Sequence, residues 1–274
     1  MDRHLPKLIL CDVDGTLLPS GANVVSARVH EAFHAAMGAG IRCGFVSGRN
    51  VAAASAVFEG DAACHETAIG TNGMEVYLDG RLAHLELLPS EMLERIADEL
   101  RDEPRCVMGL GEGMRYHVVV GEPDIVFKEP PDNMEVVDAG GRLPDIPLYK
   151  LNVFLDADRD GTLALTRRLA AVVPELDVFM ACPGCIDFTT RGCNKATAIK
   201  WLCDELGIGL EEVVVFGDEN NDLAMLSFVP NSVAVENASP EAAAAARWHI
   251  GSVDDDAVPD AIDQLAAGRW PFVR

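Results

Sequence analysis

Two acidic segments lie far apart in the chain, and each directly follows a short apolar run. Asp12 and Asp14 come after Leu-Ile-Leu-Cys, whereas Asp218 and Asp222 lie in the loop after Val-Val-Val-Phe. Ligands of parallel α/β sheets bind beyond the carboxyl ends of the strands, and carboxylate oxygens suit a hard cation such as Mg²⁺. Two groups of carboxylates in one crevice repel each other unless a cation lies between them. We therefore expect a Mg²⁺ site there, with an Asp- and Gly-rich turn or an acidic helix cap as the plain alternative.

Two signals between these segments are typical of phosphate binding. Ser47, Gly48 and Arg49 follow the apolar run 41–46 and precede a helical segment, where a hydroxyl and free N–H groups form an anion site. Lys195 is one of only five lysines and begins a helical segment, where its charge opposes the helix dipole unless it faces an anion. An exposed surface lysine is the alternative explanation for Lys195.

These segments resemble, in order and spacing, the four motifs of the haloacid dehalogenase (HAD) superfamily. The resemblance rests on Asp12-Val13-Asp14-Gly15-Thr16, Ser47-Gly48-Arg49, Lys195 and Gly217-Asp218-Glu219-Asn220-Asn221-Asp222. The insertion between the second and third motifs, with Thr71-Asn72-Gly73 before it, resembles the Cof-type (IIB) sugar-phosphatase branch. Near the end of the chain, Val235-Glu236-Asn237-Ala238 and Asp256-Ala257-Val258 depart from the residues usual in the family, which predicts altered loops beside the site.

The resemblance implies a role for each matching residue. Asp12 would attack phosphorus and form an aspartyl-phosphate, and Asp14 would act as general acid and base. Mg²⁺ would be bound by Asp12, the backbone carbonyl of Asp14 and Asp218, with Asp222 binding directly or through water. The phosphoryl group would be held by Ser47, Gly48, Lys195 and Asn221, and Arg49 would contact the substrate.

The function that follows is a Mg²⁺-dependent phosphatase acting on a small phosphomonoester, such as a sugar phosphate or a related metabolite. One alternative is a phosphohexomutase of the phosphomannomutase type, which returns the phosphoryl group to sugar rather than to water. Another is a catalytically silent member that binds a ligand. The complete set of acidic residues and Lys195 argues against a silent protein.

The sequence pattern around these residues predicts an α/β fold with a doubly wound, mainly parallel sheet. Short apolar runs alternate with helical periodicity in residues 1–86 and 188–274, which we assign to a Rossmann-like catalytic core. Residues 87–187 change to strand-like pieces with Gly- and Pro-rich breaks, and we assign them to an inserted α+β cap that selects the substrate. Within this cap, Lys150 and Asn152 share one face of a strand and are candidate substrate contacts. An exposed strand face is an equally good explanation.

Composition limits the partners. The chain has 274 residues, about two domains at ~150 residues each. Its net charge is −22 and its sequence pI is about 4.5, which excludes a general binder of nucleic acid or of anionic membranes. No apolar stretch is long enough for a membrane span, and no secretory signal is visible. We expect eight reduced cysteines, a cytoplasmic location, a monomer or homodimer and a small phosphorylated substrate.

Two patterns suggest a transition metal without requiring one. His30 and His34 lie in the sequence His-Glu-Ala-Phe-His, which matches the zinc motif H-E-x-x-H. No third ligand is evident from the sequence, so solvated helix histidines are expected. Cys182 and Cys185 form a C-x-x-C pair without a second pair. We expect a hinge turn between cap and core there rather than a metal or redox site.

Overall fold

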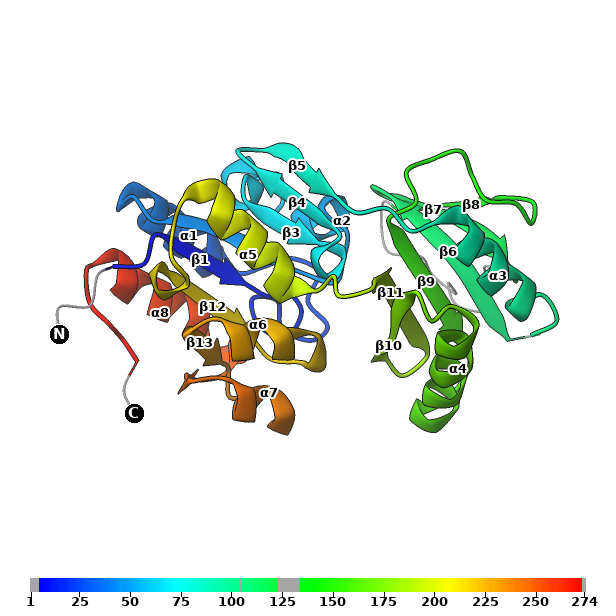
Figure 1. Cartoon of the computed structure of the whole chain (residues 1–274). Helices are drawn as coiled ribbons and strands as arrows, with labels where there is room; N and C mark the ends of the chain where they lie inside the picture. Colours follow the sequence, from blue (N-terminus) through cyan, green and yellow to red (C-terminus); the bar gives the residue numbers. More distant parts are fainter. Residues whose placement is uncertain (1–4, 104, 123–133, 273–274) are drawn as a thin grey trace. The chain divides into compact units, whose positions relative to one another are not determined.

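The computed structural model divides the chain into two compact units, which are described separately (Figure 1). Its description covers residues 5–103, 105–122 and 134–272. Unit 1 comprises Met1–His84 and Asn194–Arg274, and unit 2 comprises Leu85–Cys193. The sequence places the inserted segment at 87–187, within unit 2.

Unit 1 is built on an eight-stranded sheet with the order β14-β13-β12-β1-β2-β3-β4-β5. The six strands from β14 to β3 in this order are parallel, whereas β4 runs antiparallel to β3. Every residue of the neighbouring strands β1 and β12 is buried, as expected for strands covered on both faces. The strands are β1 (Leu8–Cys11), β2 (Arg42–Val46), β3 (Ala68–Gly70), β4 (Glu75–Leu78), β5 (Arg81–Leu85), β12 (Val213–Gly217), β13 (Asn231–Ala234) and β14 (Trp248–His249).

Helices cover both faces of this sheet (Figure 1). One face packs against α1 (Ala27–Gly38), α2 (Val51–Ala56) and α8 (Ala257–Ala266). The other packs against α5 (Lys195–Leu206), α6 (Leu223–Phe228) and α7 (Pro240–Ala245). Short 3-10 helices complete the unit: η1 (Ala62–His65), η2 (Thr71–Gly73), η4 (Leu210–Glu212), η5 (Asn220–Asp222) and η6 (Val253–Asp255). The doubly wound α/β class predicted from the sequence is therefore confirmed.

The pairing of β1 with β12 brings the two acidic segments to one edge of the sheet. The strands are parallel, and Cys11 is aligned with Phe216. The backbone N–H of Asp12 donates to the carbonyl of Phe216 at 2.9 Å, so the ladder continues one residue beyond β1. Both strands therefore end at the same level, where a doubly wound sheet binds its ligands.

Unit 2 contains a six-stranded sheet with the order β10-β11-β9-β6-β7-β8. Its strands are β6 (Cys106–Glu112), β7 (Arg115–Val120), β8 (Glu135–Asp138), β9 (Lys150–Leu155), β10 (Leu176–Cys182) and β11 (Cys185–Thr190). Two amphipathic helices, α3 (Ser90–Leu100) and α4 (Arg159–Val172), bury apolar residues such as Leu93, Ile96 and Leu169. In the part of the chain that the structure describes, no helix has the length and hydropathy needed to cross a bilayer.

The Cys182–Cys185 segment is the turn of a hairpin and not a hinge. β10 and β11 are antiparallel, and Cys182 is paired directly with Cys185 across the turn. Both residues lie inside unit 2, whereas the units divide between Cys193 and Asn194. The expected hinge was wrong because Pro-Gly also suits a tight connection between two paired strands.

Close packing inside unit 1 depends on Gly44, in the middle of β2. A Cβ atom on Gly44 would collide with the backbone carbonyl of Thr67 in the neighbouring segment. A backbone carbonyl cannot move aside as a flexible side chain can, so the approach of the two segments requires glycine.

We expect Gly44→Ala to lower the free energy of unfolding by about 1–3 kcal/mol, the usual effect of overpacking a core. Gly38→Ala is the matched control, because a Cβ atom at the end of α1 meets no other atom within 4 Å. Urea unfolding of both variants and the wild type measures the difference. Equal stability of Gly44→Ala and wild type would contradict the close approach.

Candidate active site

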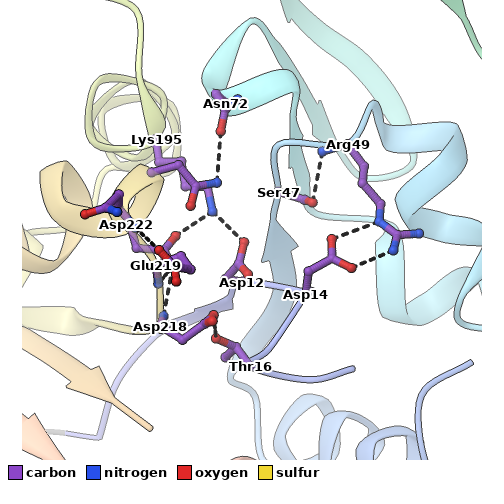
Figure 2. A network of polar contacts seen from close by, with 12 residues as sticks. Asp12, Asp14, Thr16, Ser47, Arg49, Asn72, Lys195, Asp218, Glu219 and Asp222 are labelled. Carbon is purple, nitrogen blue, oxygen red and sulfur yellow. Dashed lines mark hydrogen bonds and ion pairs between the residues drawn. The ribbon is translucent and has the colours of Figure 1, made fainter. Parts of the chain in front are cut away.

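A buried lysine joins the two acidic segments. Lys195 is the first residue of α5 and is fully buried. Its Nζ lies 2.5 Å from Oδ1 of Asp12 and 2.5 Å from Oδ1 of Asp222 (Figure 2). The side chain of Asn194 caps the helix by accepting hydrogen bonds from two backbone N–H groups of the first turn. The lysine predicted to face an anion at a helix N-terminus therefore faces two carboxylates.

Asp222 anchors the second acidic loop. Its Oδ1 contacts Lys195, and its Oδ2 accepts hydrogen bonds from the backbone N–H groups of Asp218 (2.9 Å) and Glu219 (3.1 Å). Asp222 is completely buried at the end of η5. Both of its carboxylate oxygens therefore hold protein groups, and they fix the position of Asp218.

Asp218 faces the turn that follows Asp12. Its Oδ1 accepts a hydrogen bond of 2.6 Å from the hydroxyl of Thr16. Gly15 has a φ of +83°, and a Cβ atom there would collide with the carboxylate of Asp218, so glycine is needed for both reasons. Carboxylate oxygens of Asp12, Asp218 and Asp222 all lie within 4.8 Å of one another. The structure thus brings together three of the four acidic residues singled out from the sequence.

Three carboxylates around one ammonium group leave an excess of negative charge. Burial raises the pKa of Asp12 well above its ordinary value, and Asp222 and Asp218 add to the effect although Lys195 opposes it. Burial and the charge of Asp222 raise the pKa of Asp218 to about 7. Burial lowers the pKa of Lys195, but Asp12 and Asp222 outweigh it and raise the pKa overall. The cluster therefore favours a further positive charge.

Asp14 makes a separate contact, on the other side of Asp12 from Lys195 (Figure 2). Its carboxylate forms a two-point ion pair with Arg49, with Nε to Oδ2 at 2.8 Å and Nη2 to Oδ1 at 2.5 Å. About half of the Asp14 side chain is exposed, in contrast to the buried Asp12. Exposed pairs of this kind contribute little to stability, so Asp14 can exchange partners at low cost.

The predicted phosphate-binding residues also lie together. The hydroxyl of Ser47 accepts a hydrogen bond of 3.1 Å from the backbone N–H of Arg49. A Cβ atom on Gly48 would lie 3.2 Å from Oδ1 of Asn72 and 3.5 Å from Nδ2 of Asn221, so both amides line the Gly48 backbone. Asn221 donates to Asn72 at 3.2 Å. Ser47, Gly48 and Asn221 thus come together from two distant segments.

Three residues with supporting contacts were not assigned roles from the sequence. Thr16 orients Asp218, and Asn72 orients Asn221. The amide of Asn237 donates to the carbonyl of Gly15 at 2.7 Å and thereby holds the turn after Asp12. Asn237 lies in the loop that departs from the family pattern. The sequence signals for it were its place in this loop and after β13, at the same edge of the sheet as Asp12.

The two candidate substrate residues of unit 2 share one partner. Lys150 Nζ lies 3.1 Å from Oδ1 of Asp187, and the side-chain amide of Asn152 donates to the same oxygen. All three side chains are buried. The alternation of polar residues along β9 therefore marks a buried polar cluster rather than an exposed strand face.

Comparison with known proteins agrees with this geometry. Residues 9–262 match the family model of the haloacid dehalogenase-like hydrolases. The chain is 27% identical over 272 residues to a 5-amino-6-(5-phospho-D-ribitylamino)uracil phosphatase of Escherichia coli, covering 97% of this chain and 98% of that protein. It is 27% identical over 252 residues to an HMP-PP phosphatase of Escherichia fergusonii, covering 86% of each.

Solved structures show the same fold. A haloacid dehalogenase-like hydrolase from Bacteroides thetaiotaomicron superposes with a TM-score of 0.81 at 25% identity, covering 95% of this chain and 99% of that one. A HAD subclass IIB sugar phosphatase superposes with a TM-score of 0.78 at 22% identity, covering 94% and 98%. The resemblance drawn from the sequence motifs, and with it the expectation of a phosphatase-type enzyme, is confirmed. The chain belongs to the haloacid dehalogenase-like hydrolases.

Proposed function

We propose that this hydrolase is a Mg²⁺-dependent phosphatase that transfers the phosphoryl group of a small phosphomonoester first to Asp12 and then to water. The observation that carries the proposal is the convergence of Asp12, Asp218 and Asp222 around the buried Lys195. Transition states of phosphoryl transfer need positioned positive charge more than covalent chemistry. Lys195 supplies one such charge, and the surplus of carboxylates can bind a cation that supplies a second.

The residues at this site fit Mg²⁺. The donors are carboxylate oxygens, which this hard cation prefers, and burial together with mutual repulsion raises the pKa values of Asp12 and Asp218. We assign Asp12, Asp218 and the backbone carbonyl of Asp14 as ligands. Because both oxygens of Asp222 are engaged by protein groups, we assign Asp222 to positioning Asp218, or to contact through water. When bound, Mg²⁺ would neutralise the charge that develops on the phosphoryl oxygens.

In the first step, an oxygen of Asp12 attacks phosphorus. Lys195 holds Oδ1 of Asp12, so we assign Oδ2 as the attacking atom. The new bond joins Oδ2 to phosphorus, the bond from phosphorus to the substrate oxygen breaks, and Asp14 gives its proton to that oxygen. Lys195, Asn221 and the Ser47–Gly48 segment hold the transferring oxygens, which stabilises charge in the transition state.

In the second step, Asp14 takes a proton from water while the water oxygen attacks phosphorus. The bond between Asp12 and phosphorus breaks, inorganic phosphate leaves, and both aspartates return to their first state. Asp14 must therefore leave its ion pair with Arg49, which engages both of its carboxylate oxygens. We infer that a phosphate ester draws Arg49 to itself and frees Asp14, which agrees with Arg49 as a substrate contact.

We further propose that unit 2 is the cap domain that selects the leaving group. The curated relatives named above act, by their names, on a phosphorylated ribitylaminouracil and on HMP-PP. We propose that the substrate here is also a small phosphorylated metabolite, such as a sugar phosphate, with Lys150 and Asn152 as polar contacts of unit 2. A cytoplasmic location and a monomer or homodimer stay predictions from the sequence.

Asp12→Asn should abolish turnover while preserving the fold, because an amide oxygen is a poor nucleophile. The measurement is phosphate release from a panel of phosphorylated sugars and related metabolites with Mg²⁺. EDTA should remove the wild-type activity, and Mg²⁺ should restore it. Undiminished hydrolysis by Asp12→Asn would exclude the covalent mechanism. Isomerisation of a sugar phosphate that depends on a bisphosphorylated sugar, without net release of phosphate, would identify a mutase instead.

Asp14→Asn should slow turnover by about 10²–10⁴-fold, the usual contribution of general acid–base catalysis. Asp79→Asn is the matched control. Asp79 forms a comparable exposed ion pair with Arg42, with Oδ1 and Nη1 2.7 Å apart, and this pair lies outside the catalytic segments. Steady-state kinetics of the two variants provide the comparison. Equal rates for both would remove Asp14 from the proton transfers.

Mg²⁺ should stabilise the protein more at pH 8 than at pH 5. In the metal-free protein the pKa of Asp218 is raised to about 7, so below that pH a proton must leave before the metal binds. Apparent affinity should then fall by at least roughly tenfold per pH unit, because one competing proton on Asp218 gives that slope and the raised pKa of Asp12 adds to it. Thermal unfolding with and without Mg²⁺ measures the shift, which Asp218→Asn should lose. A shift independent of pH would contradict the competition.

A further inference from the structure

A second group of possible metal ligands lies in unit 1, on the face of the sheet covered by α1. Nδ1 of His30 and Nε2 of His34 lie 3.0 and 2.7 Å from the same oxygen, Oδ2 of Asp61. The thiol of Cys64 lies 3.4 Å from that oxygen and 3.9 Å from Nδ1 of His30. Donor atoms of His30, Asp61 and Cys64 all lie within 4.8 Å of one another, and His34 joins this group through its contact with Asp61.

Two short helical segments bring these side chains together. His30 and His34 are four residues apart on α1 and share one helix face. Asp61 and Cys64 are three residues apart at the start of η1. The ring of His30 packs edge-on against Phe58, with centroids 6.1 Å apart at 85°, which fixes its orientation. The turn after Phe58 thus sets the η1 residues beside the histidines.

The carboxylate of Asp61 contacts side chains of α1 and η1 instead of capping its own helix. It occupies the N-cap position of η1, yet its side chain makes no capping hydrogen bond. Asp residues at this position usually cap the helix. Instead, its carboxylate contacts both histidines and the buried Cys64. The side chain of Asp61 therefore holds His30, His34 and Cys64 together instead of capping η1.

The distances among His30, Asp61 and Cys64 are close to those of a tetrahedral zinc site. Zinc binds nitrogen and oxygen ligands at about 2.0–2.2 Å and thiolate at about 2.3 Å, which places neighbouring ligand atoms roughly 3.3–3.6 Å apart. The separations among His30, Asp61 and Cys64 are 3.0, 3.4 and 3.9 Å. Insertion of an ion among these three ligands therefore requires shifts of a few tenths of an ångström, whereas His34, at 2.7 Å from the Asp61 oxygen, must move away from that oxygen to become a fourth ligand.

We propose that His30, Asp61 and Cys64, with His34 as the fourth ligand, form a Zn²⁺ site separate from the catalytic carboxylates. Imidazole and thiolate are softer ligands than oxygen alone and favour zinc over Mg²⁺. Cys64 is fully buried, whereas about half of the His34 side chain is exposed, so His34 is the ligand at the entrance. The site joins α1 to η1 and stabilises this part of the core.

The role is structural rather than hydrolytic. In a zinc protease the glutamate of H-E-x-x-H acts as general base beside an open metal position. Here Glu31 forms an ion pair with Arg28 at 3.2 Å, and four protein ligands fill a tetrahedral metal. The pattern predicted from the sequence to be two solvated histidines therefore gains a carboxylate and a thiol from a segment about 30 residues later.

The test uses the full chain with saturating Mg²⁺ and Co²⁺ as a spectroscopic probe for the zinc position. We expect one Co²⁺ per chain, absorption bands of a tetrahedral ion, a thiolate-to-cobalt charge-transfer band, and displacement by Zn²⁺. Cys64→Ser should remove the charge-transfer band. Asp61→Asn and His30→Ala should each lower Zn²⁺ affinity at least about 10-fold. Loss of a residue that only hydrogen-bonds to a metal ligand already costs about that much, and these two residues are proposed as ligands themselves.

His65→Ala is the matched control, since His65 lies in η1 but outside the cluster, and it should bind Co²⁺ as the wild type does. His34→Ala tests the exposed ligand and keeps the buried thiol in place, so it decides the matter if Cys64→Ser fails to fold. Phosphatase activity with Mg²⁺ verifies that each variant is folded. Absence of the charge-transfer band in the wild type, or wild-type affinity in both His30→Ala and His34→Ala, would overturn the proposal.

Discussion

The buried ammonium group of Lys195 between Asp12 and Asp222 is the interaction on which the rest of unit 1 depends. Removing charges from water costs several kcal/mol per ion, and close partners must offset this. The lysine meets its two carboxylates only if β1 and β12 are neighbours and α5 begins at that edge. The Asn194 cap and the η5 turn fix the two ends of this arrangement. The strand order that builds the core is therefore the same one that brings Lys195 to its two carboxylates.

The same arrangement explains how an acidic chain can accept an anionic substrate. The net charge of −22 is spread over a surface, where exposed charges are screened beyond about 8 Å at physiological salt. Lys195 and the proposed Mg²⁺ act at contact distance in a buried site, where screening is weak. Local positive charge thus decides binding, while the overall charge affects mainly the encounter.

Much of the candidate site was predictable because it depends on local rules. An unbroken apolar run that stops at Asp12, and another that stops before Asp218, indicate two buried parallel strands and their carboxyl ends. The hydrogen bonds made by Thr16, Asn72 and Asn237 were not predictable, because each joins segments distant in sequence. The sequence pattern of one segment does not specify which side chain of a distant segment will contact it.

The same limit applies to His30 and to Cys182. The spacing of His30 and His34 predicts a shared helix face, but it does not show that Asp61 and Cys64 pack against that face. The Cys-Pro-Gly-Cys sequence predicts a tight turn, which is present, but not which elements the turn connects. Hairpin and hinge require the same backbone freedom, so only the pairing of β10 with β11 separates them.

The position of β1 in the sheet also affects how the chain folds. One neighbour of β1 is β2, which follows about 30 residues later, whereas the other is β12, about 200 residues later with all of unit 2 in between. Joining such distant segments requires closure of a long loop and slows folding. Unit 2 is continuous in sequence and can form its own sheet meanwhile. During synthesis, Asp12 therefore emerges 183 residues before Lys195, so its carboxylate gains this partner only after all of unit 2 has been made.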